Sequence, residues 1–145
     1  MKLFIFVLIV FQSVRALGQN DEKVNKSLCE SHLDTLTNIE VYLTAEKIPE
    51  PNGGMTNLYK MISKTLIFPR QKFERMGIEP SKIIVGFIVN EEGRIIGKRI
   101  IQNIEGTNVA VQILKIITDF EWKSGFCDNK PVPVMMILPI QVCLR

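Results

Sequence analysis

The side chains that could carry out chemistry in this chain are few, and they do not gather into a known pattern. His32 is the only histidine. The potential metal ligands near it in sequence are Cys29, Glu30 and Asp34. A zinc site of the usual kind needs about four cysteine or histidine ligands, or about three and an open position. The sequence therefore favours a solvated His32 and predicts no metal site.

Paired carboxylates are the next candidates, because two carboxyl groups can act as a general acid and a general base. Glu91 and Glu92 are adjacent in a segment that is typical of a turn, where neighbouring side chains point apart and into water. Gly53-Gly54 lacks the Lys-Ser/Thr that completes a phosphate-binding loop. No serine or cysteine stands in an evident motif with a histidine. We therefore predict that the protein is not an enzyme and needs no cofactor.

The first residues predict export from the cytoplasm. Lys2 precedes nine apolar residues, 3–11, a run shorter than the roughly 20 residues that cross a membrane. Such a run is typical of the apolar core of a signal peptide. Ala16 and Gly18 are small residues of the kind that a signal peptidase reads. We expect a signal peptide at 1–18 and a periplasmic mature protein that begins at Gln19. An uncleaved anchor in the inner membrane is the alternative.

The charge of the chain argues against nucleic acid as a partner. Loss of Lys2 and Arg15 with the leader would lower the formal net charge from +3 to +1. The remaining basic residues alternate with acidic ones along most of the chain, whereas nucleic-acid binding needs a clustered basic face. A mixed, solvated surface is the simpler interpretation.

Three cysteines, Cys29, Cys127 and Cys143, could form one disulfide in an oxidising compartment. If residues 132–143 form one strand, a rise of about 3.3 Å per residue separates Cys127 from Cys143 by tens of Å. A disulfide allows only about 4.4 to 6.8 Å between Cα atoms. Any bridge should therefore involve Cys29, and three unpaired thiols remain the open alternative.

The length of 145 residues favours one domain, since about 100 to 200 residues per domain is usual. Residues 19–39 are polar and predict a loose arm or a marginal helix, and residues 40–145 are expected to form the domain. Apolar spacing and turn residues predict its elements. They are a strand at 39–48, a helix of about three turns from Met55, a short helix at 70–76, a hairpin of 83–89 and 94–102, and a helix at 109–120 that ends near a core Trp122.

The terminal segment has the sharpest pattern. Its even-numbered residues from Val132 to Val142 are all apolar, which predicts a strand with one buried face. Pro133 and Pro139 share the odd parity, and proline is tolerated only where no ladder bond is needed. We infer that the even-numbered amides pair inward and that this strand is the edge of the sheet. The donors on its open side would be Met135, Ile137, Gln141 and Cys143.

In this order the elements resemble the C-terminal domain of TonB, the periplasmic end of a bacterial energy transducer. The segments that carry the resemblance are Phe68-Pro69, Met76-Gly77-Ile78, Asn90-Glu91-Glu92-Gly93-Arg94-Ile95, Phe120-Glu121-Trp122-Lys123 and Val132-Pro133-Val134. Residues 48–55 are similar to the lead-in of TonB-like proteins of Bacteroidetes. The resemblance covers residues 40–144. It implies an α+β fold, a small antiparallel sheet with helices packed on one face.

In the TonB family this domain binds a short peptide of an outer-membrane transporter by adding it as an extra strand. The present chain departs from the transducer in two ways, with a leader in place of an anchor and no proline-rich spacer. The resemblance therefore implies peptide binding at the edge donors rather than energy transfer. A free-standing periplasmic interaction module with a partner unrelated to transport is the second hypothesis, and neither hypothesis involves a small-molecule substrate.

Overall fold

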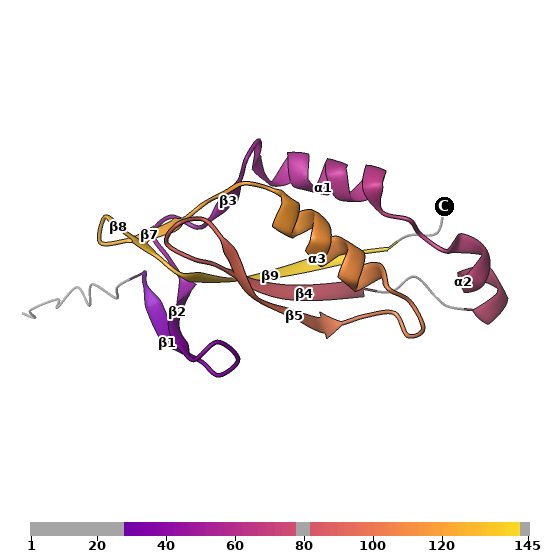
Figure 1. Ribbon diagram of the computed structural model, residues 1–145, viewed down its shortest axis with the longest axis horizontal. Helices are drawn as coiled ribbons and strands as arrows, with labels where there is room; N and C mark the ends of the chain where they lie inside the picture. The colour runs from indigo at the N-terminus through magenta and orange to yellow at the C-terminus, as the bar shows by residue number, and fades with distance from the viewer. Residues whose placement is uncertain (1–27, 78–81, 143–145) are drawn as a thin grey trace, which may run out of the picture.

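The computed structural model describes residues 28–77 and 82–142. These residues form a small α+β fold, as the sequence predicted. The expected signal peptide at 1–18 and the expected donor Cys143 lie outside the described residues. Figure 1 shows helices above an elongated sheet, with a strand hairpin below it at one end.

Five strands make the main sheet, in the order β1-β2-β9-β4-β5. They are β1 (Glu30–Asp34), β2 (Ile39–Thr44), β4 (Lys82–Val89), β5 (Ile95–Gln102) and β9 (Val134–Gln141). β4 pairs antiparallel with both β5 and β9, whereas β2 runs parallel to β9. Parallel neighbours need a long crossover connection, and here the chain between β2 and β9 carries all the helices. The sheet is therefore mixed, where an antiparallel one was expected.

The predicted hairpin and helices are present. The helices are α1 (Gly54–Thr65), α2 (Arg70–Met76) and α3 (Val109–Asp119). α1 and α3 lie over one face of the sheet, while α2 extends at one end of the molecule (Figure 1). Leu58 of α1, Phe87 of β4 and Ile113 of α3 are fully buried in the core between these layers.

Trp122 belongs to the core, as predicted. Its ring meets Phe87 edge to face, with 5.2 Å between the centroids, and its Nε1–H donates to the carbonyl of Ile117 at 3.0 Å. The β4–β5 turn packs against the same residue, because a Cβ built on Gly93 would lie 2.1 Å from the Trp122 carbonyl oxygen. Only glycine fits at this close approach, where φ is +77°.

Two small sheets complete the fold. β3 (Glu50–Pro51) pairs with β6 (Trp122–Lys123), and β7 (Gly125–Cys127) pairs with β8 (Lys130–Val132). The first of them holds the chain that enters α1 beside the chain that leaves α3. The predicted strand at 39–48 is shorter than expected, because it ends at Thr44, before the segment that leads to β3.

The N-terminal arm is corrected where the structure describes it. Residues 30–34 form β1, which pairs antiparallel with β2, where a loose arm or marginal helix was expected. Leu33 and Leu36 are both exposed, so this segment has no buried apolar face of the kind that a packed helix needs. β1 has no apolar alternation, so its pairing with β2 and the tertiary contacts described below stabilise it instead. His32 is exposed on this strand, as expected.

Candidate functional site

Alternate residues of β9 face opposite sides of the sheet, as the terminal pattern predicted. Leu138 is buried in the core with the helices, and Val134 is buried in a second cluster with Cys127 and Val132. Ile137, Pro139 and Gln141 are exposed on the other side. The strand therefore has one side-chain face in the core and one on the surface.

The prolines show which way the main-chain groups of β9 point. Pro139 lies opposite Ile84 of β4 and has no N–H to give to the ladder. The carbonyl of Pro133 accepts a hydrogen bond of 2.8 Å from the Tyr42 N–H of β2, on the side away from β4. The odd-numbered residues thus direct their main-chain groups away from β4. This agrees with the parity inferred from the sequence.

β9 is a free edge only over its C-terminal part, which corrects the expected edge at 132–142. Tyr42 of β2 lies opposite Val134. Beyond that position no other described strand pairs with this side of β9. The N–H of Met135 faces β2 at this pair, so the expected donor Met135 is covered, whereas Ile137 and Gln141 lie on the open part. Pro139, which has no N–H, separates these two open donors.

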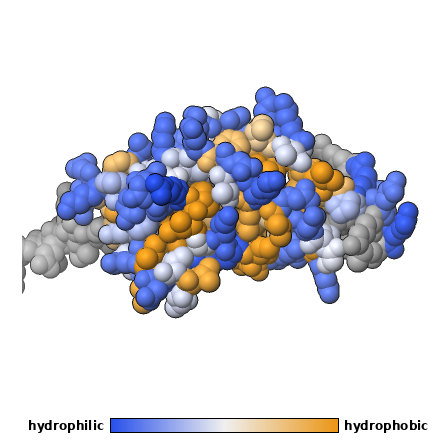
Figure 2. All heavy atoms as spheres, in the orientation of Figure 1, coloured by the Kyte–Doolittle hydropathy of each residue, from blue (hydrophilic) through white to orange (hydrophobic). Residues whose placement is uncertain are grey.

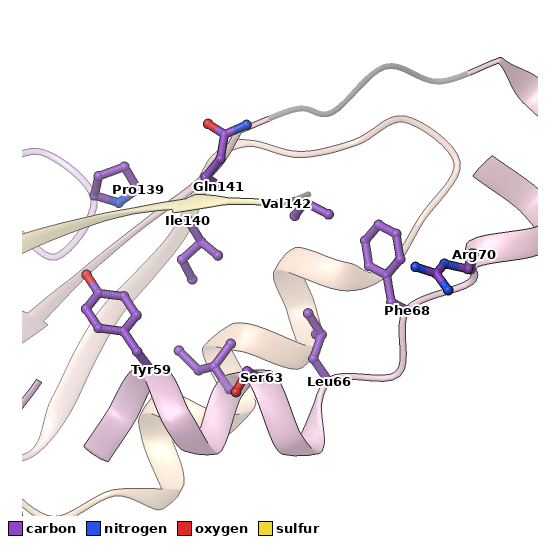
Figure 3. A pocket seen from close by; sticks show the side chains of 10 residues that line it. Tyr59, Ser63, Leu66, Phe68, Arg70, Pro139, Ile140, Gln141 and Val142 are labelled. Carbon is purple, nitrogen blue, oxygen red and sulfur yellow. The ribbon is translucent and has the colours of Figure 1, made fainter. Parts of the chain in front are cut away.

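A groove runs between α1 and the open end of β9. It has a volume of about 700 Å³. One wall consists of Tyr59, Ile62 and Ser63 of α1 and of Leu66, which follows this helix. The other wall consists of residues 139–142, at the end of β9 and just after it. Figure 3 shows these side chains on the two sides of the groove. Sequence reasoning missed this groove, because its walls come from segments that are far apart in the chain.

Phe68 and Arg70 close the end of the groove nearest Val142. The connection that carries them is held by α3, where the Gln112 side chain makes two hydrogen bonds with the main chain of Ile67, at 3.0 and 3.2 Å. No aspartate or glutamate lines the groove. Arg70 is therefore the only charged side chain in its lining, and it gives that end a positive charge.

The sheet ends in β1 on one side and in β5 on the other, so β5 offers a further free edge, beyond β4. Exposed apolar side chains lie on β5 and on the neighbouring α3, namely Ile100, Ile101 and Val111. Figure 2 shows apolar residues among hydrophilic ones in the middle of the face that carries these elements. The register of β5 against β4 shifts twice, and Gly97 has a φ of +56°. Bulges and charged residues such as Lys98 are features that discourage edge pairing, so β5 is the poorer site for an added strand.

One buried ion pair lies below the sheet, and sequence reasoning missed it. The Arg99 guanidinium donates to both carboxylate oxygens of Asp34, at 2.7 and 3.0 Å. The Thr37 N–H and hydroxyl donate to the same carboxylate at 3.0 and 2.7 Å. The Arg99 side chain and then the Thr37 hydroxyl hold the pKa of Asp34 well below its usual range, although burial opposes them. All the polar groups are satisfied here, so the pair fastens the β1–β2 turn to β5 and offers no reactive group.

A disulfide fastens the other end of the same hairpin. Cys29, which precedes β1, is bonded to Cys127 at the end of β7, with 6.1 Å between the Cα atoms. The expectation that any bridge involves Cys29 is confirmed. The hairpin β1–β2 is thus tied at both ends, and β2 is held in place beside the start of β9.

The described residues contain no cluster of three or more side chains that could hold a metal ion. Within the same ranges, no helix is long and apolar enough to cross a membrane. A scan against protein-family models finds no match, and searches of curated proteins and of solved structures find none.

Proposed function

We propose that the protein is a periplasmic domain that binds an extended peptide of an outer-membrane transporter as an extra strand beside β9. The observation that supports this most is the open part of that strand. Beyond Met135 no other described strand pairs with the side of β9 that faces away from β4. Main-chain groups on such an edge pair readily with another extended chain.

The added strand is short. β2 blocks its extension toward Pro133, and Pro139 removes one donor from the middle of the edge. The N–H groups of Ile137 and Gln141 and the carbonyls of Ile137, Pro139 and Gln141 remain as partners. Few main-chain bonds form, and the peptide must be ordered on binding, so we expect a dissociation constant on the order of micromolar rather than nanomolar.

The test is calorimetry with a synthetic peptide that has the sequence of the periplasmic N-terminal segment of a transporter from the same cell. Gln141→Pro should abolish binding and leave the fold intact, because the Gln141 amide faces away from β4. Proline at 141 is also compatible with an extended Ile140 before it.

Ile140→Pro is the control, because it places the same residue at the neighbouring position of β9. Its amide faces β4, opposite Ile83, so this substitution should disrupt the sheet, which circular dichroism would detect. Undiminished affinity in a folded Gln141→Pro protein would rule out this edge. No binding by the unmutated domain would favour an interaction module unrelated to transport, and cross-linking in whole cells would then identify its partner.

A further inference from the structure

We propose that the groove between α1 and the end of β9 binds a single-chain fatty acid, with its alkyl chain along the apolar walls and its carboxylate on Arg70. This inference goes beyond the proposed function and does not depend on it, because the ligand is a small amphiphile and not a peptide. Ser63 has no histidine or carboxylate beside it in the lining. The ligand is therefore held and not converted.

The size of the groove suits one alkyl chain. Pockets for small ligands usually have volumes of about 300 to 1,000 Å³, and this groove has about 700 Å³. Its lining follows α1 from Tyr59 to Leu66, which is roughly 10 Å along a helix axis, and continues to Arg70. An extended single chain fits this elongated space better than a lipid with two chains.

The floor of the groove is apolar and belongs to the core. Ile62 is 4% exposed and Val142 is 8% exposed, and Phe68 and Ile140 pack against the same core cluster. Figure 3 shows Ile140 pointing toward α1, whereas Gln141 points away from it. An alkyl chain on this floor covers apolar surface without rearranging the core. Each methylene that leaves water should strengthen binding by up to about fourfold.

The charge of the groove favours a carboxylate. Arg70 is exposed at the end nearest Val142 and is the only charged side chain in the lining. The only ion pair among the described residues joins Arg99 to Asp34, so Arg70 has no carboxylate partner in that part of the chain. A guanidinium binds a carboxylate through two parallel hydrogen bonds. One carboxylate matches its charge, whereas a phosphate monoester carries about two negative charges and would leave one unmatched.

The position of Arg70 is fixed by the elements around it. Gln112 of α3 binds both main-chain groups of Ile67, and the Arg70 N–H donates to the carbonyl of Phe68 at 2.8 Å. The connection between α1 and α2 is thus held against α3. A cation stands at one end of an apolar channel, which is the arrangement that a long-chain carboxylate requires.

A bound fatty acid would exclude an added strand where the proposed function holds. Side chains of a strand beside β9 alternate between the two faces of the sheet. Those on the face of Ile140 would enter the same space as the alkyl chain. Fatty acid and peptide should therefore compete, and the acid would regulate peptide binding.

Calorimetry with decanoate, below the concentration at which it forms micelles, tests the ligand class. Decanoate should bind as one molecule per domain. Decylammonium, which has the same chain and the opposite charge, should bind roughly fivefold more weakly or less. Hexanoate, with four fewer methylenes, should bind on the order of tenfold more weakly or less. Equal affinity for decanoate and decylammonium would overturn the role of Arg70, and tighter binding of decyl phosphate would overturn the carboxylate.

Two pairs of matched variants test the site. Arg70→Gln should weaken decanoate binding roughly fivefold or more, whereas Arg75→Gln, an exposed change on the same helix, should not alter it. Ser63→Trp fills the groove from an exposed position and should prevent binding. Thr65→Trp adds the same bulk to α1 at an exposed position outside the lining and should not.

The outcomes separate this inference from the proposed function. No decanoate binding by the unmutated domain, or undiminished affinity in a folded Ser63→Trp protein, would overturn the fatty-acid site. Either result leaves strand addition standing, because the transporter peptide and Gln141→Pro test that separately. Decanoate binding that is lost with Ser63→Trp and weakened with Arg70→Gln supports the site even if no transporter peptide binds.

Discussion

Removal of the Cys29–Cys127 disulfide should destabilise the whole domain. The bridge joins residues separated by 98 positions, so it closes a loop that contains nearly all the described elements. Such a cross-link stabilises a protein mainly by restricting the unfolded chain. The proposed variant is Cys29→Ser, made together with Cys143→Ser so that no third thiol can exchange with the remaining cysteine.

The magnitude follows from the loop length. For a separation of 98 residues, the loop-closure relation gives an entropy of about 16 cal/mol/K, or about 4.7 kcal/mol at 25 °C. Measured losses often fall below this value, so we expect about 3 to 5 kcal/mol. With a urea dependence of about 2 kcal/mol per molar, the unfolding midpoint should fall by roughly 1.5 to 2.5 M.

Urea titration followed by tryptophan fluorescence measures this loss, because Trp122 is the only tryptophan and is buried against Phe87. The reference is the Cys143→Ser protein with its bridge intact, and the same protein after reduction should match the double variant. An unchanged midpoint in the double variant would refute the reasoning, since the bridge would then constrain only the β1–β2 hairpin and not the global fold.

Two further predictions concern the faces of the sheet. Leu138→Ala should lower the free energy of unfolding by about 2 to 5 kcal/mol, because Leu138 is a core residue. The neighbouring Ile137 is 59% exposed, so Ile137→Ala should lower it little. Equal losses in urea titration would show that the register of β9 is wrong. Asp34 has a pKa below its unfolded value of about 3.8, so its ion pair should contribute stability at neutral pH that is lost as the pH falls below that value. Asp34→Asn should remove this acid-dependent part of the stability, and an identical pH profile for the two proteins would contradict the assignment.

Periodicity predicted the elements that have an apolar face. α1, α3, the β4–β5 hairpin and the buried face of β9 all follow from residues at helical or alternate spacing. The parity of Pro133 and Pro139 also predicted the direction of the β9 main-chain groups. β1 was missed because it is polar and is stabilised by a disulfide and an ion pair with distant residues, a kind of contact that local spacing does not reveal.

The candidate site was only partly predictable for a related reason. The donors expected on β9 share one parity of a single strand, so their spacing alone could predict them, although the cover that β2 gives to the start of β9 was not foreseen. The groove depends on how α1 packs against the end of β9, which the sequence does not encode in one segment. Arg70 stands in no motif, and only the folded chain shows that it is the one charged residue in the lining of the groove.

The central claim is that an extended peptide pairs with the open part of β9, and amide hydrogen exchange tests it most directly. In isotope-labelled protein, exchange of the Ile137 and Gln141 amides should be fast alone and slow in the complex with a bound transporter peptide. The amides of β1 and β5, the two end strands of the sheet, should not change. Protection of β5 amides, or none at Ile137 and Gln141 under saturating peptide, would contradict strand addition at β9.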